Sequence, residues 1–129
     1  MSVDRGQALV ELALALPVIL ALAVGIAELS EVGVARLALE HAAAEGAREG
    51  ALTNEDALVR ASVVASAAPL DPARVDIDID PPQGLRGRDP RGSLLRVRLS
   101  YALAAPLGFL GLPAFIVHGD AARRMEWTP

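Results

Sequence analysis

The feature that most constrains this chain is an apolar run near its N-terminus, residues 8–27. Glu11 is the single charged residue in it. An α-helix rises 1.5 Å per residue, so a run of this length forms a helix about 30 Å long, which matches the hydrocarbon thickness of a bilayer. Pro17 does not argue against a helix here, because membrane-spanning helices tolerate proline where neighbouring groups satisfy the freed carbonyl. The run therefore predicts one transmembrane helix over residues 8–27.

A cleaved secretory signal is the alternative interpretation of the same segment. Arg5 would supply its basic start, and residues 21–23 (Ala-Leu-Ala) fit a small-residue cleavage site. However, the apolar run is longer than the ~7–15 residues of a signal-peptide core, and a carboxylate near its start is atypical. We therefore expect an anchor that is retained.

Helical patterning continues beyond the apolar run. Residues 28–50 are rich in alanine and carry charges of both signs, and Arg36 and Glu40 are one turn apart, where they can pair. We expect one continuous helix over residues 7–50, its first part in lipid and the rest outside, with Gly50 as its stop. Small residues recur at four-residue steps, where another helix can approach closely. They are Ala13, Pro17, Ala21 and Gly25 in the apolar run and Ala42, Gly46 and Gly50 after it.

The rest of the chain, residues 51–129, predicts a small domain that begins with a second, short helix. Thr53 can cap its N-terminus, with Asp56 three residues later in the capping-box position. Pro69 ends it. Its predicted apolar face consists of Leu58, Ala61, Val64 and Ala65.

From residue 74 the apolar period changes from 3.6 to 2, which predicts strands. Apolar residues alternate with three aspartates over residues 75–80 and with two arginines over residues 95–99. An antiparallel pair would set the aspartates against the arginines on the solvent face, with the apolar side chains facing the helix. A third strand is expected around residues 116–127. The apolar residues 104–114 between the last two strands are either an exposed docking patch or a cover for the open face of the sheet.

Composition excludes several classes of function. The net charge is −4, which gives no electrostatic footprint for nucleic acid. The chain has no cysteine, so disulfides, thiolate metal sites and cysteine nucleophiles are excluded. Residues 76, 78 and 80 are aspartates, but Pro81 and Gly87 stand where a calcium loop needs glycine and glutamate. We read this row as a solvated face.

Other chemical residues form no recognisable constellation. His41 and His118 each stand alone, and no serine has the surroundings of a nucleophile. Arg86, Arg88 and Arg91 are expected in a flexible, solvated loop, with contact to an anionic polymer or headgroup as the alternative. We therefore expect no enzyme activity, no cofactor, no metal and no small-molecule substrate.

The start of the chain carries a family resemblance. Gly6 directly precedes the apolar run, and Glu11 is the fifth residue after it. Residues 5–17 (RGQALVELALALP) resemble the opening of the TadE-like family of tight-adherence, or Flp-type, pilus systems. The resemblance continues through residues 25–28 (GIAE) and 42–48 (AAAEGAR), and residues 121–126 (AARRME) resemble the family's last strand.

The resemblance implies a pilin-like α+β fold and a prepilin peptidase that cuts after Gly6. Gln7 would then carry a free ammonium, which Glu11 of a neighbouring subunit could neutralise inside lipid, where an unpaired charge is costly. Residues 1–6 would be a short cytoplasmic leader. The protein would cross the cytoplasmic membrane once, with its N-terminus inside and residues 51–129 outside.

The expected function is that of a minor pilin or pseudopilin in the assembly of an adhesive surface pilus or a related secretion complex. Its expected partners are the lipid bilayer, a prepilin peptidase and other pilin-like or pilus-assembly subunits. Two alternatives stay open: a membrane-anchored binding or scaffold module that never enters a filament, and an exported soluble domain. The mature N-terminus distinguishes them, being Gln7 for the first, Met1 or Ser2 for the second and near Val24 for the third.

Overall fold

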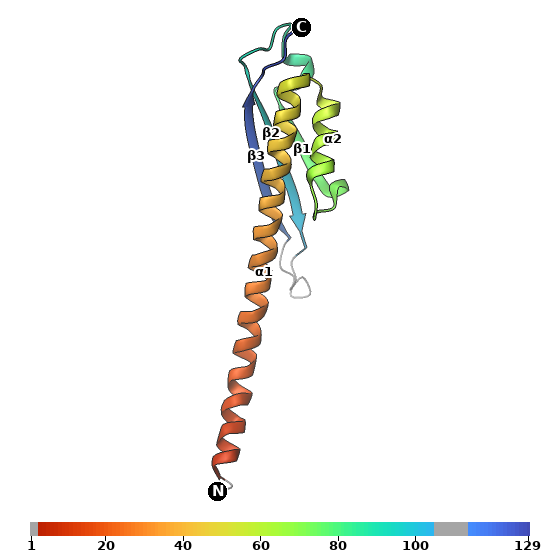
Figure 1. Cartoon of the computed structure of the whole chain (residues 1–129). Coiled ribbons are helices and arrows are strands. Elements are labelled where there is room, and N and C mark those ends of the chain that lie inside the picture. Colours follow the sequence, from red (N-terminus) through yellow and green to blue (C-terminus); the bar gives the residue numbers. More distant parts are fainter. Residues whose placement is uncertain (1–2, 105–113) are drawn as a thin grey trace. The chain divides into compact units, whose positions relative to one another are not determined.

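The computed structural model of the chain describes residues 3–104 and 114–129. Its main elements are α1 (Val3–Thr53), α2 (Asp56–Ser66), β1 (Val75–Asp80), β2 (Leu94–Leu103) and β3 (Phe115–Arg124), with single 3-10 turns at Pro72–Arg74 and Gln83–Leu85 (Figure 1). The fold is α+β, with a long apolar N-terminal helix, a short second helix and a three-stranded antiparallel sheet, as predicted. The chain divides into two compact units, Met1–Glu31 and Val32–Pro129.

Helix α1 extends beyond both predicted ends. It begins at Val3 rather than residue 7 and ends at Thr53, so the prediction of Gly50 as its stop is wrong. Asn54 ends it instead: this residue has φ 58°, and its N–H donates to the Gly50 carbonyl at 3.0 Å. Asparagine tolerates this left-handed conformation, which satisfies a carbonyl that the helix end leaves open.

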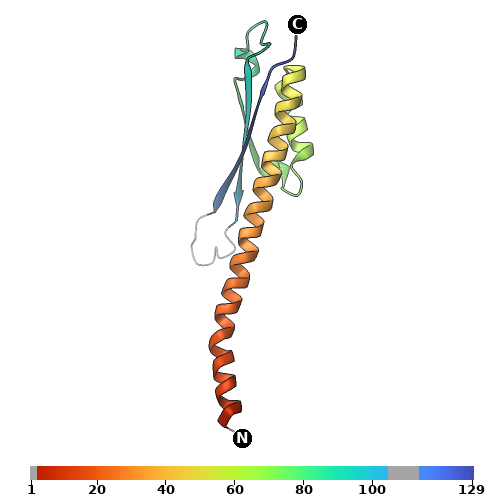
Figure 2. The same cartoon turned by 60° about the vertical axis from the view of Figure 1, so that its left-hand side comes forward.

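The unit Val32–Pro129 has two layers. The second part of α1, together with α2, covers one face of the sheet, whose strand order is β1-β2-β3 (Figures 1 and 2). Alanine dominates the buried face of α1, so the strands and α2 approach it closely and supply most of the bulk of the core. Each large side chain removed from water contributes about 1.5–3 kcal/mol. The largest fully buried side chains are Leu39, Val59, Val63, Leu95, Val97 and Leu99.

The predicted pairing of the aspartate strand with the arginine strand is confirmed. β1 and β2 are antiparallel, with Asp78 opposite Arg98 and Ile79 opposite Val97. Arg98 binds two carboxylates of β1: Nη1 lies 2.9 Å from Asp78 Oδ2, and Nη2 lies 3.4 Å from Asp80 Oδ2. Because these side chains are exposed, each ion pair contributes less than about 1 kcal/mol. Burial of the opposite face fixes the register, since a slip by one residue would turn that face to solvent.

The third predicted strand is also present, with different bounds. β3 covers Phe115–Arg124 and pairs antiparallel with β2, with Leu103 opposite Phe115 and Leu94 opposite Arg124. The ladder is prolonged past β3, because Met125 N–H donates to the Ser93 carbonyl at 2.8 Å. Of the apolar segment predicted to cover the sheet or to dock, residues 105–113 lie outside the described residues.

Two predictions about α2 are wrong. The helix starts at Asp56 with Glu55 at its N-cap, and Thr53 does not cap it, because the Thr53 hydroxyl donates back to the Glu49 carbonyl of α1 at 2.9 Å. Gln83 instead satisfies a backbone donor at the start of the helix: its side-chain Oε1 accepts from the Asp56 N–H at 3.1 Å. The buried face is also different, since Leu58, Ala61, Val64 and Ala65 are exposed, and Val59, Val63 and Ala67, at four-residue steps, are buried.

The loop between β1 and β2 is anchored rather than free, which corrects the prediction for Arg86. This side chain is buried, forms an ion pair with Asp56 and donates to the Pro81 carbonyl at 2.8 Å and to Asn54 Oδ1 at 3.2 Å. A guanidinium can be buried only if its donors are satisfied, and these contacts meet that need. Arg86 therefore joins the loop to the junction of α1 and α2, whereas Arg88 is exposed.

Candidate functional site

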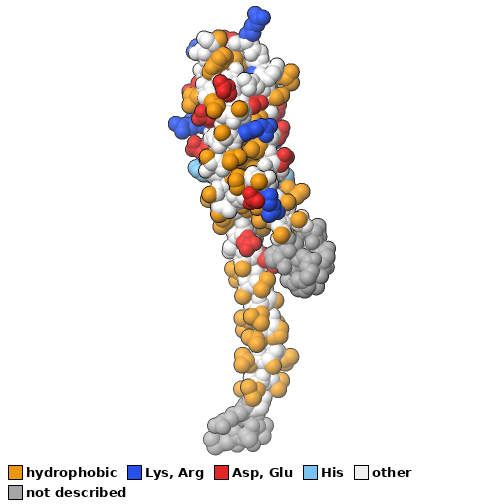
Figure 3. Space-filling view, turned by 90° about the vertical axis from the view of Figure 1, so that its right-hand side faces the viewer, with side chains coloured by type: hydrophobic (Ala, Val, Ile, Leu, Met, Phe, Trp, Pro, Cys, Tyr) orange, Lys and Arg blue, Asp and Glu red, His pale blue; other side chains and the backbone are white. Residues whose placement is uncertain are grey.

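The N-terminal part of α1 is apolar on all sides. Its large side chains from Leu9 to Ile26 are exposed, and the segment is long and apolar enough to cross a membrane. A helix of this kind either lies inside a large protein or spans a bilayer, and here its surface is exposed. On the face shown in Figure 3, hydrophobic side chains cover this segment, and most charged side chains belong to the folded unit. The exposed large residues include Leu9, Val10, Leu12, Leu14, Leu16, Val18, Ile19, Leu20, Leu22, Val24 and Ile26.

The predicted processing residues lie on the first turns of this helix. Gly6 is exposed, and a Cβ built there would meet no atom within 4 Å. The Gln7 side-chain amide lies one turn from Glu11, with Nε2 3.5 Å from Oε1. This distance is at the limit of a hydrogen bond, so the contact satisfies little of the carboxylate's capacity. Glu11 thus stands exposed among apolar neighbours and is free to accept a stronger donor.

The first of the two predicted small-residue sets faces outward. Ala13, Pro17, Ala21 and Gly25 are all exposed, and a Cβ built on Gly25 would meet nothing within 4 Å. Small residues at this spacing allow the backbone of another helix to come close in a membrane. This set is therefore a surface on which a second helix can lie.

The second set is occupied within its own unit. Ala42, Gly46 and Gly50 are buried in the interface of α1 with α2 and β2. A Cβ on Gly46 would lie 2.6 Å from Val63 Cγ2, and one on Gly50 would lie 2.5 Å from Leu95 Cδ2. These glycines therefore let α2 and β2 approach α1 inside the domain, and they are not available to another subunit.

The remaining polar candidates lie in the folded unit: the aspartates of β1 lie in the sheet, and the two histidines lie on the surface of the unit. Asp78 and Asp80 form ion pairs with Arg98, and among the side chains that the structure describes no group of three His, Asp or Glu is placed to hold a metal ion. His41 lies beside the turn Ala68–Pro69, and His118 lies in a groove with Asp120. Among the described side chains, the hydroxyls of Ser30, Thr53 and Ser93 donate to backbone carbonyls and not to a histidine.

Sequence reasoning missed two residues that shape the domain, Arg86 and Gly119. A glycine inside a strand often marks close approach of another backbone, so Gly119 carried a signal that could have been used. Arg86 carried none, because nothing in its local sequence separates it from Arg88 and Arg91.

Comparison with known proteins bears on the apolar helix and its continuation. Residues 6–48 match the family model described as TadE-like protein. The match begins at Gly6 and covers the whole apolar run and the first part of the α1 segment within the folded unit. No curated protein and no solved structure shows significant similarity to the chain.

Proposed function

We propose that this chain, which is TadE-like over residues 6–48, is a minor pilin or pseudopilin that takes part in assembling an adhesive surface pilus or a related secretion complex. The family match associates it with tight-adherence, or Flp-type, pilus systems. The observation that carries the proposal is the location of that match, which starts at Gly6 and includes Glu11 and the exposed apolar helix. The proposed role is physical and needs no catalytic site in this chain.

The apolar helix is the proposed anchor. Its exposed leucine, valine and isoleucine side chains would face lipid, and the hydrocarbon layer requires about 20 such residues in a helix. We propose a single-pass topology with the N-terminus in the cytoplasm and the folded unit outside. The partners would be the bilayer, a prepilin peptidase and other pilin-like subunits.

Processing is the proposed first step. The peptidase would hydrolyse the Gly6–Gln7 bond, with water supplying the hydroxyl of the new Gly6 carboxylate and a proton of the new Gln7 amine. Gly6 is exposed and has no side chain beside that bond, which lies in the first turns of α1. The Gln7 ammonium and Glu11 of adjacent subunits would then neutralise each other as the helices assemble.

The mass of the mature chain tests this proposal against its rivals. Processing gives a chain that begins at Gln7, and replacing Gly6 by leucine is expected to abolish it. Gly25→Leu is the matched control, because Gly25 is equally open but lies near the opposite end of the apolar run, far from the Gly6–Gln7 bond. A chain that keeps Met1 or Ser2 indicates an anchored scaffold module, and one that begins near Val24 indicates an exported domain; both results contradict the proposal.

A further inference from the structure

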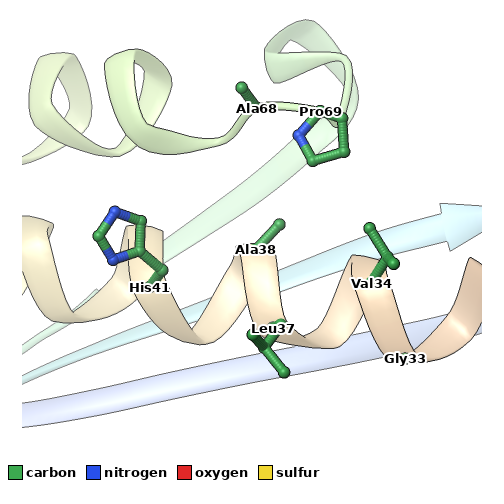
Figure 4. A pocket seen from close by; sticks show the side chains of 7 residues that line it. All are labelled: Gly33, Val34, Leu37, Ala38, His41, Ala68 and Pro69. Atoms are coloured by element: carbon green, nitrogen blue, oxygen red, sulfur yellow. The ribbon is translucent and has the colours of Figure 1, made fainter.

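Two large apolar side chains are exposed where α1 enters the unit Val32–Pro129. Val34 is 53% exposed and Leu37 is 73% exposed. They line an open groove of about 400 Å³ whose other wall is the turn Ala68–Pro69 after α2. Figure 4 shows Val34 and Ala38 pointing toward that turn and Leu37 pointing away from it. This flank of α1 is therefore apolar and open.

The other flank of α1 at the same end is also apolar. Phe115 and Ile116, the first residues of β3, are 52% and 64% exposed. They line a second groove, of about 410 Å³, together with Val32 and Arg36 of α1. The entry end of the unit thus carries exposed apolar side chains on both sides of the helix. We call this set the apolar rim, and its residues are Val34, Leu37, Ala68, Pro69, Phe115 and Ile116.

Exposure alone does not set the rim apart, because Leu85 at the other end of the unit is 77% exposed. Position does. Only residues 28–31 separate the apolar run, which ends at Ala27, from Val32. The five residue steps from Ala27 to Val32 span at most about 18 Å even when the chain is fully extended. If a bilayer holds the run, the rim is therefore tethered beside it, whatever direction the unit takes.

We propose that the apolar rim inserts into the headgroup layer of the bilayer, so that the folded unit rests on the membrane as well as being anchored in it. This inference rests on the membrane anchor of the proposed function. Apolar side chains leave water at that depth. Arg36 is paired with Glu40 at 2.9 Å and Arg74 donates to the Ala102 carbonyl at 2.7 Å, and the long stems of both side chains let these charges stay at the level of the headgroups. Glu40 and Asp120 line the second groove, so this end carries carboxylates as well as arginines and the contact does not depend on anionic lipid.

Single-cysteine labelling of the full-length chain tests the proposal, because the chain has no natural cysteine. Ile116→Cys and Leu37→Cys place an environment-sensitive fluorophore on the rim, Leu85→Cys places it at the opposite end, and Leu16→Cys places it in the span. All four side chains are exposed, so the label displaces no core residue. Each variant is reconstituted in phosphatidylcholine vesicles that contain lipids with a nitroxide at the headgroup or deep in the acyl chain.

We expect emission from positions 37 and 116 to shift to shorter wavelength and to be quenched more by the headgroup nitroxide than by the deep one. Position 16 should show the reverse order, and position 85 should show neither effect. Quenching at position 16 without quenching at positions 37 and 116 overturns the rim contact and leaves the anchor standing. No quenching at position 16 overturns the anchor itself. A shift at position 116 that disappears on dilution of the protein, without quenching, indicates that a second protein covers the rim and overturns the lipid assignment.

Discussion

Gly119 of β3 crosses Leu39 of α1 so closely that a Cβ on Gly119 would lie 2.6 Å from both the Leu39 Cβ and its carbonyl carbon. The Glu40 backbone nitrogen is 2.7 Å from the same point. Contacts of this kind involve backbone on both sides, which cannot move aside as the end of a flexible side chain can. The sheet and the helix therefore meet at a position that only glycine can occupy, and this crossing sets the distance between the two layers.

Gly119→Ala is expected to lower the free energy of unfolding by about 3 kcal/mol, the upper end of the usual cost of overfilling a core. Urea titration in detergent micelles, followed by the fluorescence of Trp127, measures it, because this is the chain's single tryptophan and it packs against the core. Gly84→Ala is the control, since its added Cβ would meet nothing within 4 Å. Equal stability of the two variants would show that the helix can shift away from β3.

The buried Arg86 leads to a second prediction. Asp56→Asn keeps the size of the side chain but removes the charge that Arg86 faces, leaving a buried guanidinium without its carboxylate. Removal of one partner from a buried ion pair costs about 3 kcal/mol, and the partial exposure of Asp56 keeps the expected loss at that lower end. The same urea titration measures it. Arg88→Gln, in the same loop but exposed, should change stability by less than about 0.5 kcal/mol.

The two small-residue sets should respond differently to the same change. Gly50→Leu forces a side chain against Leu95 and Val59, so it should destabilise the domain by about 1–3 kcal/mol or more. Gly25→Leu should leave the unfolding of the domain unchanged, because nothing lies near Gly25. It should instead reduce association with other helices in the membrane, which co-purification of differently tagged subunits measures. A domain destabilised by Gly25→Leu would contradict this division.

The parts of the fold that were predictable from sequence are those with a strong local period. The apolar run predicted the first part of α1, and the alternation of aspartates and arginines with apolar residues predicted the pairing of β1 with β2 and even its charge contacts. In each case one physical requirement dictates the residue type at every position: burial of one face for the strands, and an apolar surface on all faces for the candidate membrane span. The TadE-like start was recognisable for the same reason, because it lies in this segment.

The parts that were not predictable depend on contacts distant in sequence. Residues 56–66 are apolar on nearly every side, so the sequence could not show that Val59 and Val63, rather than Leu58 and Val64, face α1. Gly50 resembled a helix stop because glycine serves both as a stop and as a site of close approach, and only the position of Leu95 distinguishes the two. Arg86 was assigned to a solvated loop because its partner Asp56 lies 30 residues away in the chain.

The last prediction concerns Glu11, which is exposed in the apolar helix and has only the Gln7 amide within reach among the described side chains. A carboxylate in a membrane span costs roughly 2.5–3.5 kcal/mol at the centre and less toward the edge, so a side chain one turn into the span can reach the headgroups without any partner. If that is all Glu11 does, Glu11→Gln should change neither processing nor assembly, because glutamine is also polar and nearly the same size.

If Glu11 instead neutralises the Gln7 ammonium of a neighbouring subunit, Glu11→Gln leaves that ammonium uncompensated in a medium of low dielectric, which costs several kcal/mol. In the proposed order of events cleavage precedes assembly and needs no such pair, so we expect the variant to be cut after Gly6 and yet to lose its association with other pilin-like subunits. The mass of the mature chain reports the first step, and the amount of partner subunit that co-purifies from membranes reports the second. Glu11→Asp is the matched control: it keeps the charge on a shorter side chain and should retain part of the association that glutamine loses. Undiminished co-purification with Glu11→Gln would reduce Glu11 to a tolerated interfacial carboxylate and remove the charge-pairing step from the proposed mechanism.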